Sequence, residues 1–107
     1  MNRVSTYTKA LAALGHESRL DLFRLLVRAG SAGMSVGQIS ETLALHPSTL
    51  AHHLSMLVQA NLVVQSRVGR TVICRAHYTQ IDHLIGYLTE NCCAGVVSGK
   101  AKPAMEE

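Results

Sequence analysis

Hydrophobic residues recur at helical spacing in several separate stretches of the chain. The first stretch, residues 4–14, is followed by Gly15, and the second, from Ser18 onward, ends at a Gly-Ser-Ala-Gly run over residues 30–33. Apolar residues three and four positions apart share one face of a helix, and a glycine often follows the last turn. The second stretch is apolar on more than one face, so we expect a buried central helix there. Ser18, with Asp21 three positions later, resembles a capping box at its start.

Two shorter helices are predicted next, separated by a tight connection. Ser35 and Gln38 have the spacing of a capping box, which indicates the start of a short helix. Pro47 suits the first position of the following helix, because its missing N–H would have no partner there in any case. We expect this following helix to cover residues 47–60.

The 47–60 helix has an apolar side and a polar side. Leu50, Leu54, Leu57 and Val58 form the apolar stripe. At about 100° per residue, the opposite side carries mostly small polar groups. The residues on this side are Ser48, Thr49, His52, Ser55, Met56 and Gln59. His53 falls on the flank, where we expect it to pack or to make a local hydrogen bond.

The period of the pattern then changes. Residues 62–68 and 71–78 are rich in β-branched side chains, and only two residues, Gly69 and Arg70, lie between the two runs. Such a pair of runs is typical of a β-hairpin. Basic side chains gather toward its tip. They are Arg67, Arg70 and, further along, Arg75.

A last helical repeat begins near Thr79. Its apolar residues share one face. They are Ile81, Leu84, Ile85 and Leu88. Continuing the same helix places Cys92 on that face and turns Cys93 away from it by about 100°.

Length and charge narrow the class of protein. The chain has 107 residues, 48% of them hydrophobic, and a net charge of +3, which suits one small domain that gains from dimerisation and permits nucleic-acid binding. We place that domain at residues 1–93. Residues 94–107, rich in Gly, Ser, Lys, Pro and Glu, are expected to be a disordered tail. The chain holds no apolar run that could cross a bilayer and no hydrophobic signal segment, so we expect a cytoplasmic protein.

The predicted order is four helices, a β-hairpin and a last helix (α-α-α-α-β-β-α), a mainly α fold with a β-hairpin wing. Two short helices in succession, followed by a hairpin, are typical of a winged helix-turn-helix. There the second short helix enters the major groove of DNA and the basic tip reaches phosphates or the minor groove. The residues expected to bind DNA are Ser48, Thr49, His52, His53, Ser55, Arg67 and Arg70. Alternatively, these positions are plain solvated surface, or the domain is a protein–protein adaptor.

Over about residues 9–88 the chain resembles the ArsR/SmtB family of winged-helix metal-sensing repressors. The matching segments are A13-L-G-H-E-S-R-L-D-L-F-R-L-L26, M34-S-V-G-Q-I-S-E-T-L43, P47-S-T-L-A-H-H-L54, L57-V-Q-A-N-L-V63 and the wing R67-V-G-R70. The resemblance implies a homodimer built on the first and last helices, which binds a two-fold operator in double-stranded DNA. It also implies an inducer, usually a metal or metalloid ion, that releases the DNA.

The family places its sensor sites in several locations, and two of them fit this chain poorly. A frequent arsenic-sensor pattern, Cys-x-Cys in the first helix of the DNA-binding motif, is absent, because residues 35–42 hold no cysteine. A zinc-type site on the last helix would use Asp82, His83 and Glu90, with His77 just before that helix. These residues contain no His-x-x-His pair, so the zinc-type sensor is kept only as an alternative.

Cys92 and Cys93 are adjacent in the sequence and are the main candidates for the sensor. Soft thiolates select thiophilic ions such as As(III), Sb(III), Cd(II), Hg(II) and Cu(I). Trivalent arsenic forms pyramidal complexes with three bonds, so two thiolates leave one bond for a third sulfur, a hydroxide or a methyl group. We therefore predict As(III) or a trivalent organoarsenical as the inducer, without separating the two, and no permanent cofactor. The alternative is a thiol redox or persulfide sensor of the same fold.

The third cysteine, Cys74, lies on a predicted strand with Val72 and Ala76 on the same face. A last helix of about 20 Å separates this strand from the cysteine pair, so we expect Cys74 to be a small buried hydrophobe and not a third ligand within its own chain. A thiol enzyme is not expected. The sequence shows no base placed near the pair, no Gly-rich phosphate loop and no Cys-x-x-Cys.

Overall fold

The computed structural model describes residues 2–97 and 100–101. Over these residues the helices are α1 (Arg3–Leu14), α2 (Glu17–Ala29), α3 (Val36–Leu43), α4 (Pro47–Gln59) and α5 (Tyr78–Thr89), with a 3-10 turn η1 (Gly30–Ala32) after α2. The strands are β1 (Met34–Ser35), β2 (Val63–Val68), β3 (Thr71–Ala76), β4 (Val96–Val97) and β5 (Lys100–Ala101). The order of the main elements confirms the predicted winged helix-turn-helix.

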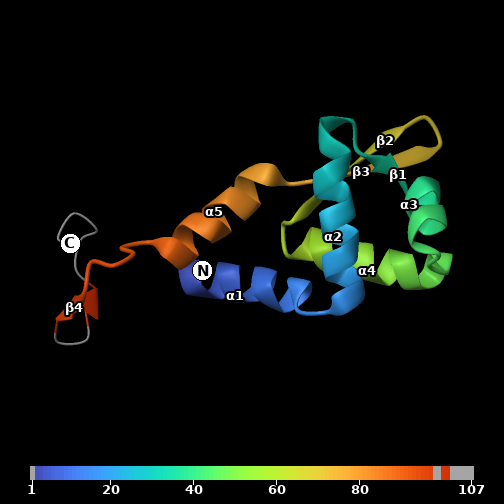
Figure 1. Ribbon diagram of the computed structural model, residues 1–107. Helices are drawn as coiled ribbons and strands as arrows, with labels where there is room; N and C mark the ends of the chain where they lie inside the picture. Colours follow the sequence, from blue (N-terminus) through green and yellow to red (C-terminus); the bar gives the residue numbers. More distant parts are fainter. Residues whose placement is uncertain (1, 98–99, 102–107) are drawn as a thin grey trace.

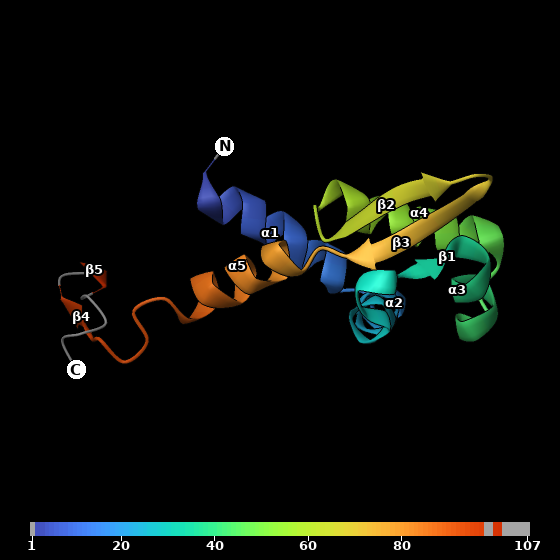
Figure 2. The same cartoon turned by 90° about the horizontal axis from the view of Figure 1, so that it is seen from above.

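The elements fall into two groups (Figure 1). Helices α2, α3 and α4 pack around the sheet, while α1 and α5 lie side by side and extend away from it. The view from above shows the same division, with the β2–β3 hairpin reaching past α4 at the end opposite to α5 (Figure 2). In the part of the chain that the structure describes, no helix has the length and apolar character needed to span a membrane.

The core is built from aliphatic side chains and one phenylalanine. Helix α2 contributes Leu22, Phe23, Leu25 and Leu26, and α4 contributes Leu50, Leu54 and Leu57. The remaining buried apolar residues come from α1, α3, the link between α4 and β2, the sheet and α5, and include Ala10, Ala13, Ile39, Leu62, Val63, Cys74, Ala76 and Leu84. The apolar stripe predicted for α4 is therefore confirmed at Leu50, Leu54 and Leu57 and wrong at Val58, which is 38% exposed. It fixes which side of that helix stays exposed.

The sheet has the order β1-β3-β2, and all its neighbours are antiparallel. Val68 pairs with Thr71, so the hairpin loop is the two-residue Gly69-Arg70 step that the sequence predicts, and Gly69 has a φ of 64°. Strand β1 was not predicted. It joins the sheet through the pair Met34 and Cys74, directly after Gly33.

Helix starts were predicted with mixed success. The Ser35–Gln38 capping box is present, with both reciprocal hydrogen bonds, and Pro47 opens α4 as expected. The proposed box at Ser18 is wrong, because α2 begins at Glu17 and its cap is His16, whose Nδ1 accepts the Ser18 N–H. A neutral imidazole nitrogen can accept a hydrogen bond from a backbone N–H, as a serine hydroxyl does. His16 therefore caps the helix, and Ser18 lies inside its first turn.

The C-terminal region differs from the sequence-based expectation in two ways. Helix α5 ends at Thr89, so Cys92 and Cys93 follow the helix and do not continue its apolar face. Val96–Val97 pairs with Lys100–Ala101 in a small antiparallel ladder, where the sequence indicated disorder. The other residues of the expected tail, 98–99 and 102–107, lie outside the described residues.

Candidate nucleic-acid interface and thiol pair

Helix α4 presents an exposed polar face. Ser48, Thr49, His52 and Ser55 are all exposed on it, while the leucine stripe holds the opposite side in the core. The N-cap residue His46 accepts the Ser48 N–H through Nδ1, and the Ser48 Oγ lies 2.9 Å from the same nitrogen. The first turn of α4 is thus ordered locally, and its polar groups face outward as a set.

His53 does not share that face. Its side chain is 5% exposed, its ring centroid lies 4.9 Å from that of His16, and no described residue offers its Nδ1 a hydrogen bond. Burial lowers the pKa of His53, and the positive charge that His16, Arg19 and His52 can carry lowers it further. The structure therefore supports the expectation of packing and removes His53 from the residues that can reach DNA.

The wing supplies two outward arginines and one that is held inward. Arg67 and Arg70 are exposed near the hairpin tip. Arg75 instead donates from Nε to the Ser31 carbonyl at 2.8 Å and from Nη1 to the Ser66 Oγ at 2.8 Å. Arg75 thus ties the wing to the turn after α2, and the basic tip consists of Arg67 and Arg70.

The charge of this region is one-sided. Between Glu41 and Asp82 the sequence has no Asp or Glu, and this interval contains all of α4 and the wing. A polyanion approaching the exposed face of α4 meets no carboxylate from either element, and it meets the guanidinium groups of the wing tip alongside. The surface is suited to phosphate-rich ligands.

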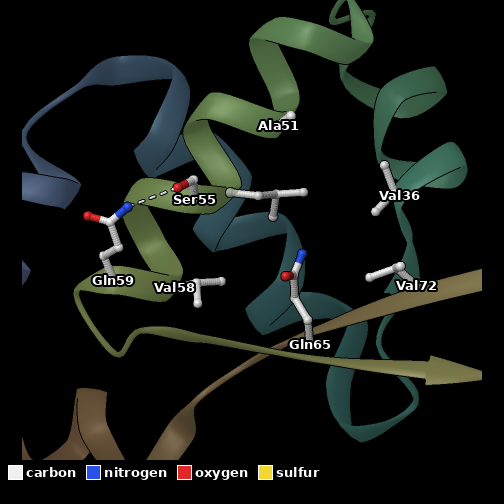
Figure 3. Close-up of a pocket in the computed structure, with 8 residues that line it drawn as sticks. Val36, Ala51, Ser55, Val58, Gln59, Gln65 and Val72 are labelled. Carbon is white, nitrogen blue, oxygen red and sulfur yellow. Dashed lines mark hydrogen bonds between the residues drawn. The ribbon is translucent and has the colours of Figure 1, made fainter.

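A groove of about 380 Å³ lies between α4 and the wing. Its apolar lining is Val36, Ala51, Leu54, Val58 and Val72, and its polar lining is Ser55, Gln59 and Gln65. Figure 3 shows the Gln59 amide donating to the Ser55 Oγ, at 3.0 Å, on the α4 side of the groove. Among the described residues, the amide of Gln65 donates to the Cys74 Sγ at 3.5 Å. Because its lining comes from α3, α4, β2 and β3, no local sequence pattern indicated this groove.

The Cys92–Cys93 pair lies in a turn after α5. Both side chains are exposed, and the two Sγ atoms are 3.3 Å apart. The Cys92 N–H donates to the Thr89 carbonyl at 3.0 Å, which holds the turn against the end of the helix. Asn91 and Cys93, on either side of Cys92, have φ values of 60° and 64°. Both residues are left-handed, a conformation that costs backbone energy for residues other than glycine.

Next to the pair, α1 and α5 are joined by a cluster that we call the clasp: Arg3, Tyr7, Tyr87 and Glu90. Arg3 Nη2 lies 2.8 Å from Glu90 Oε1, and the hydrogen bond from Arg3 to this carboxylate raises the pKa of Arg3. The Arg3 guanidinium also lies 4.9 Å from the centre of the Tyr87 ring, which stacks on Tyr7 at 4.6 Å. Glu90 precedes Cys92 by two residues, so the clasp and the thiol pair are close along the chain.

Cys74 is separate from the thiol pair. It is fully buried in the sheet, as predicted, and burial raises the pKa of its thiol. No three His, Cys, Asp or Glu side chains of the described residues come together in a way that could hold a metal ion. Of the residues considered for a zinc-type site, His77 lies with Nδ1 3.0 Å from the Asn61 carbonyl and Glu90 belongs to the clasp. The thiol pair therefore offers two ligands from one chain.

Helices α1 and α5 also carry large exposed apolar residues. Val4 and Leu11 on α1 are 57% and 43% exposed, and Ile85 and Leu88 on α5 are 54% and 57% exposed. The sequence pattern places all four on the apolar stripes of their helices. Their exposure leaves an apolar surface, at the α1–α5 end of the molecule, that a single chain does not cover.

Three comparisons with known proteins bear on the fold. The HTH_20 family model, a helix-turn-helix domain, matches residues 14–66. Among solved structures, an ArsR-like transcriptional regulator from Rhodococcus sp. RHA1 is 26% identical with a TM-score of 0.71, over 79% of this chain and 77% of that one. The transcriptional repressor BigR from Xylella fastidiosa is 26% identical with a TM-score of 0.64, over 87% of this chain and 92% of that one. No curated protein matches the chain in sequence.

A further solved structure has a fold similar to that of this chain. The homodimeric winged helix-turn-helix DNA-binding domain Mb0332 from Mycobacterium bovis is 21% identical with a TM-score of 0.68, over 80% of this chain and 77% of that one. The helix-turn-helix match spans α2, α3 and α4 and extends into β2, the elements that place the polar face beside the wing. The chain carries a helix-turn-helix domain and is similar in sequence and fold to ArsR-family winged helix-turn-helix transcriptional regulators.

Proposed function

We propose that this protein is a dimeric transcriptional repressor that binds operator DNA and releases it when a thiophilic metalloid binds Cys92 and Cys93. The observation that carries the DNA-binding part is the exposed polar face of α4 beside the arginines of the wing tip, in a region without carboxylates. Helix α4 would enter the major groove with Ser48, Thr49, His52 and Ser55 toward the base edges. Arg67 and Arg70 would contact phosphates or the adjacent minor groove.

The proposed dimer uses α1 and α5. Four large apolar side chains on these two helices are exposed in the single chain, and covering them with a second copy removes that surface from water. The related domain from Mycobacterium bovis is described as homodimeric. Two copies related by a two-fold axis would present two α4 helices to half-sites about 34–36 Å apart.

The chemistry of the thiol pair favours trivalent arsenic. Two thiols condense with arsenous acid by losing two water molecules (2 RSH + As(OH)3 → (RS)2As–OH + 2 H2O), and the oxidation states of arsenic and sulfur do not change. Metal–thiolate bonds of about 2.3 Å place two sulfurs about 3.8 Å apart around a tetrahedral ion, and about 3.3 Å apart around a pyramidal centre with near-right angles. The observed separation of 3.3 Å suits the pyramidal centre. A monosubstituted organoarsenical would bind in the same way, with its carbon in place of the remaining hydroxide.

Release would pass through the clasp. Closing an arsenic ring over the thiol pair restricts the turn that holds Cys92 against the end of α5, and Glu90 in that turn is bonded to Arg3 of α1. Because α1 and α5 are the proposed dimer helices, a shift between them changes the separation of the two α4 helices. A coupling of about 1–3 kcal/mol, or roughly 5–150-fold in DNA affinity, is typical of such regulation.

The test is an electrophoretic mobility shift on an operator isolated by in vitro selection, with arsenite and phenylarsine oxide added separately. The Cys92→Ser, Cys93→Ser double variant should bind the operator as tightly as the wild type and no longer release it. Cys74→Ala is the matched control and should keep the full response. If the double variant still releases DNA on addition of arsenite, the thiol pair is not the sensor.

The same 3.3 Å separation also favours one alternative, a thiol redox switch. Oxidation by a peroxide would join the two sulfurs and give two water molecules (2 RSH + H2O2 → RSSR + 2 H2O). The mobility shift separates the two functions when hydrogen peroxide is added in place of arsenite. Release by peroxide alone, reversed by a dithiol reductant, would favour the redox sensor over the arsenic sensor.

A further inference from the structure

We propose that the groove between α4 and the wing is a seat for one DNA strand, in which the side-chain amides of Gln59 and Gln65 donate to the sugar–phosphate backbone. This inference rests on the proposed DNA binding, and it does not depend on the identity of the inducer. It adds two contact residues that the sequence-based set of Ser48, Thr49, His52, His53, Ser55, Arg67 and Arg70 does not include.

The first argument is position. A helix in the major groove and a wing in the neighbouring minor groove lie on either side of one backbone strand, so the space between them faces that strand. The groove is this space, because α4 forms one wall and the wing strands β2 and β3 supply Gln65 and Val72 (Figure 3). Ser55 belongs both to the exposed face of α4 and to the groove, so the two surfaces are continuous.

The second argument is chemistry. The groove is lined by valines, alanine and leucine along with one serine and two glutamines, and no residue in its lining bears a charge. A deoxyribose ring presents carbon atoms that suit an apolar floor, and the phosphates on either side of it accept hydrogen bonds. Glutamine is among the side chains that contact the DNA backbone. A small anionic molecule would find no cation in this groove, whereas a DNA strand is held by the arginines of the wing tip as well.

The third argument is the state of the two amides. Each glutamine amide has two N–H donors. In the part of the chain that the structure describes, Gln59 uses one on the Ser55 Oγ at 3.0 Å, and Gln65 uses one on the Cys74 Sγ at 3.5 Å, a weak acceptor. Each amide therefore keeps a donor for a phosphate oxygen. The Ser55 bond also holds the Gln59 side chain along α4, so less rotamer freedom is lost when it binds.

The experiment compares salt dependence. Gln59→Ala and Gln65→Ala are measured by fluorescence anisotropy on a random-sequence duplex and on the selected operator, over a range of salt concentrations, with Gln80→Ala on α5 as the matched control. Loss of one hydrogen bond to a charged group should weaken binding by about tenfold on both duplexes. Because a neutral amide releases no counterion, the slope of log K against log salt should not change. Arg67→Ala or Arg70→Ala should reduce that slope by about 0.9.

The outcomes are distinct. Wild-type affinity in both glutamine variants overturns the inference, as does a changed salt slope. A loss confined to the selected operator means that the glutamines read bases and also overturns the backbone seat. As a second variant, Val58→Asp places a carboxylate in the groove, and unchanged affinity in it overturns the inference as well. A wild-type protein that binds no DNA overturns both this inference and the proposed function. Absence of an arsenite response contradicts only the proposed identity of the inducer.

Discussion

The α4 end of the molecule and the α1–α5 end use similar apolar patterns and bury them differently. In α4 the residues Leu50, Leu54 and Leu57 are all buried within the single chain. In α1 and α5, residues of the same kind and spacing, such as Leu11 and Leu88, stay exposed. The two ends have similar sequence patterns, because periodicity shows which residues share a helix face and does not show what packs against that face.

This difference in burial separates an end of the molecule that is completed within one chain from an end that is not. The α4 end has its own core, so the polar face and wing are held in position before any partner arrives. The α1–α5 end is joined within the chain by the clasp, whose ion pair between Arg3 and Glu90 is exposed, and large apolar side chains of both helices stay exposed in the single chain. In the dimer that we propose, a partner completes this surface, so an inducer bound at the thiol pair after α5 can act on assembly.

The largest expected effect comes from breaking the α1–α5 surface. Leu88→Glu places a charge in the proposed dimer contact, so sedimentation should show a monomer and operator affinity should fall roughly 10²–10⁴-fold, since two linked half-sites are reduced to one. Leu20→Glu is the control, because Leu20 is similarly exposed but lies on α2. A Leu88→Glu protein that stays dimeric with full affinity would show that this surface is not the dimer contact.

The next effect concerns the α4 end. Leu57 is fully buried, so Leu57→Ala should lower the free energy of unfolding by about 2–5 kcal/mol, measured by urea denaturation. Val68→Ala, at an exposed position of the wing, should change it by no more than about 0.5 kcal/mol. An equal, small effect of both substitutions would contradict the view that this end is completed within one chain.

A smaller effect is expected from pH. Because the pKa of His53 is lower in the folded state than its ordinary value of about 6.5, the unfolded chain takes up the proton first as the pH falls. Stability should therefore be complete above about pH 6.5 and decline below it toward the folded-state pKa, by at most about 1.4 kcal/mol per pH unit. Thermal unfolding of wild type and His53→Phe checks this, and the variant should be less sensitive to acid.

The exposed His83→Gln serves as the control for the pH series and should decline in parallel with the wild type. His16 and Arg19 of α2, and His52 of α4, are the charged or titratable groups that act on His53, so they stay unchanged in both variants. A wild-type protein whose stability rises as the pH falls through this range would contradict the assigned sign.

The smallest effect is expected at the clasp. Glu90→Gln should leave arsenite binding, counted as the loss of two titratable thiols, unchanged and reduce the arsenite-induced fall in operator affinity severalfold. Exchanging the charges, Arg3→Glu with Glu90→Arg, should restore most of the response because the ion pair is rebuilt. Full response in Glu90→Gln, or no recovery in the charge exchange, would show that the clasp does not transmit the signal.

Local signals in the sequence predicted most of the elements near the DNA-binding face. The Ser35–Gln38 capping box, Pro47 at the start of α4 and the two-residue hairpin loop are each decided by neighbours within four residues, and all are confirmed. Long-range features escaped prediction. Strand β1 has only two residues and exists because Met34 pairs with Cys74, forty positions away, and the groove needs α3, α4 and the wing together.

The thiol site shows the same difference between local features, which the sequence predicted, and long-range features, which it did not. The sequence established that Cys92 and Cys93 are adjacent, and covalent adjacency alone keeps two thiols within reach of one ion. It also indicated a continuing helix, which is wrong, because α5 ends at Thr89 and the chain turns through two left-handed residues. The end of a helix depends on the contacts of its last turn, and these include the clasp to a helix more than seventy residues earlier.

The sequence by itself therefore determined the order of the elements, the polar face of α4, the basic wing tip and the paired thiols, because each depends on the spacing of nearby residues. Only the tertiary structure decided which apolar faces are covered within the chain and which are left open, and that His53 is buried against His16. Burial is a property of what packs against a face, and that partner comes from elsewhere in the chain or, for α1 and α5, from the second copy that we propose.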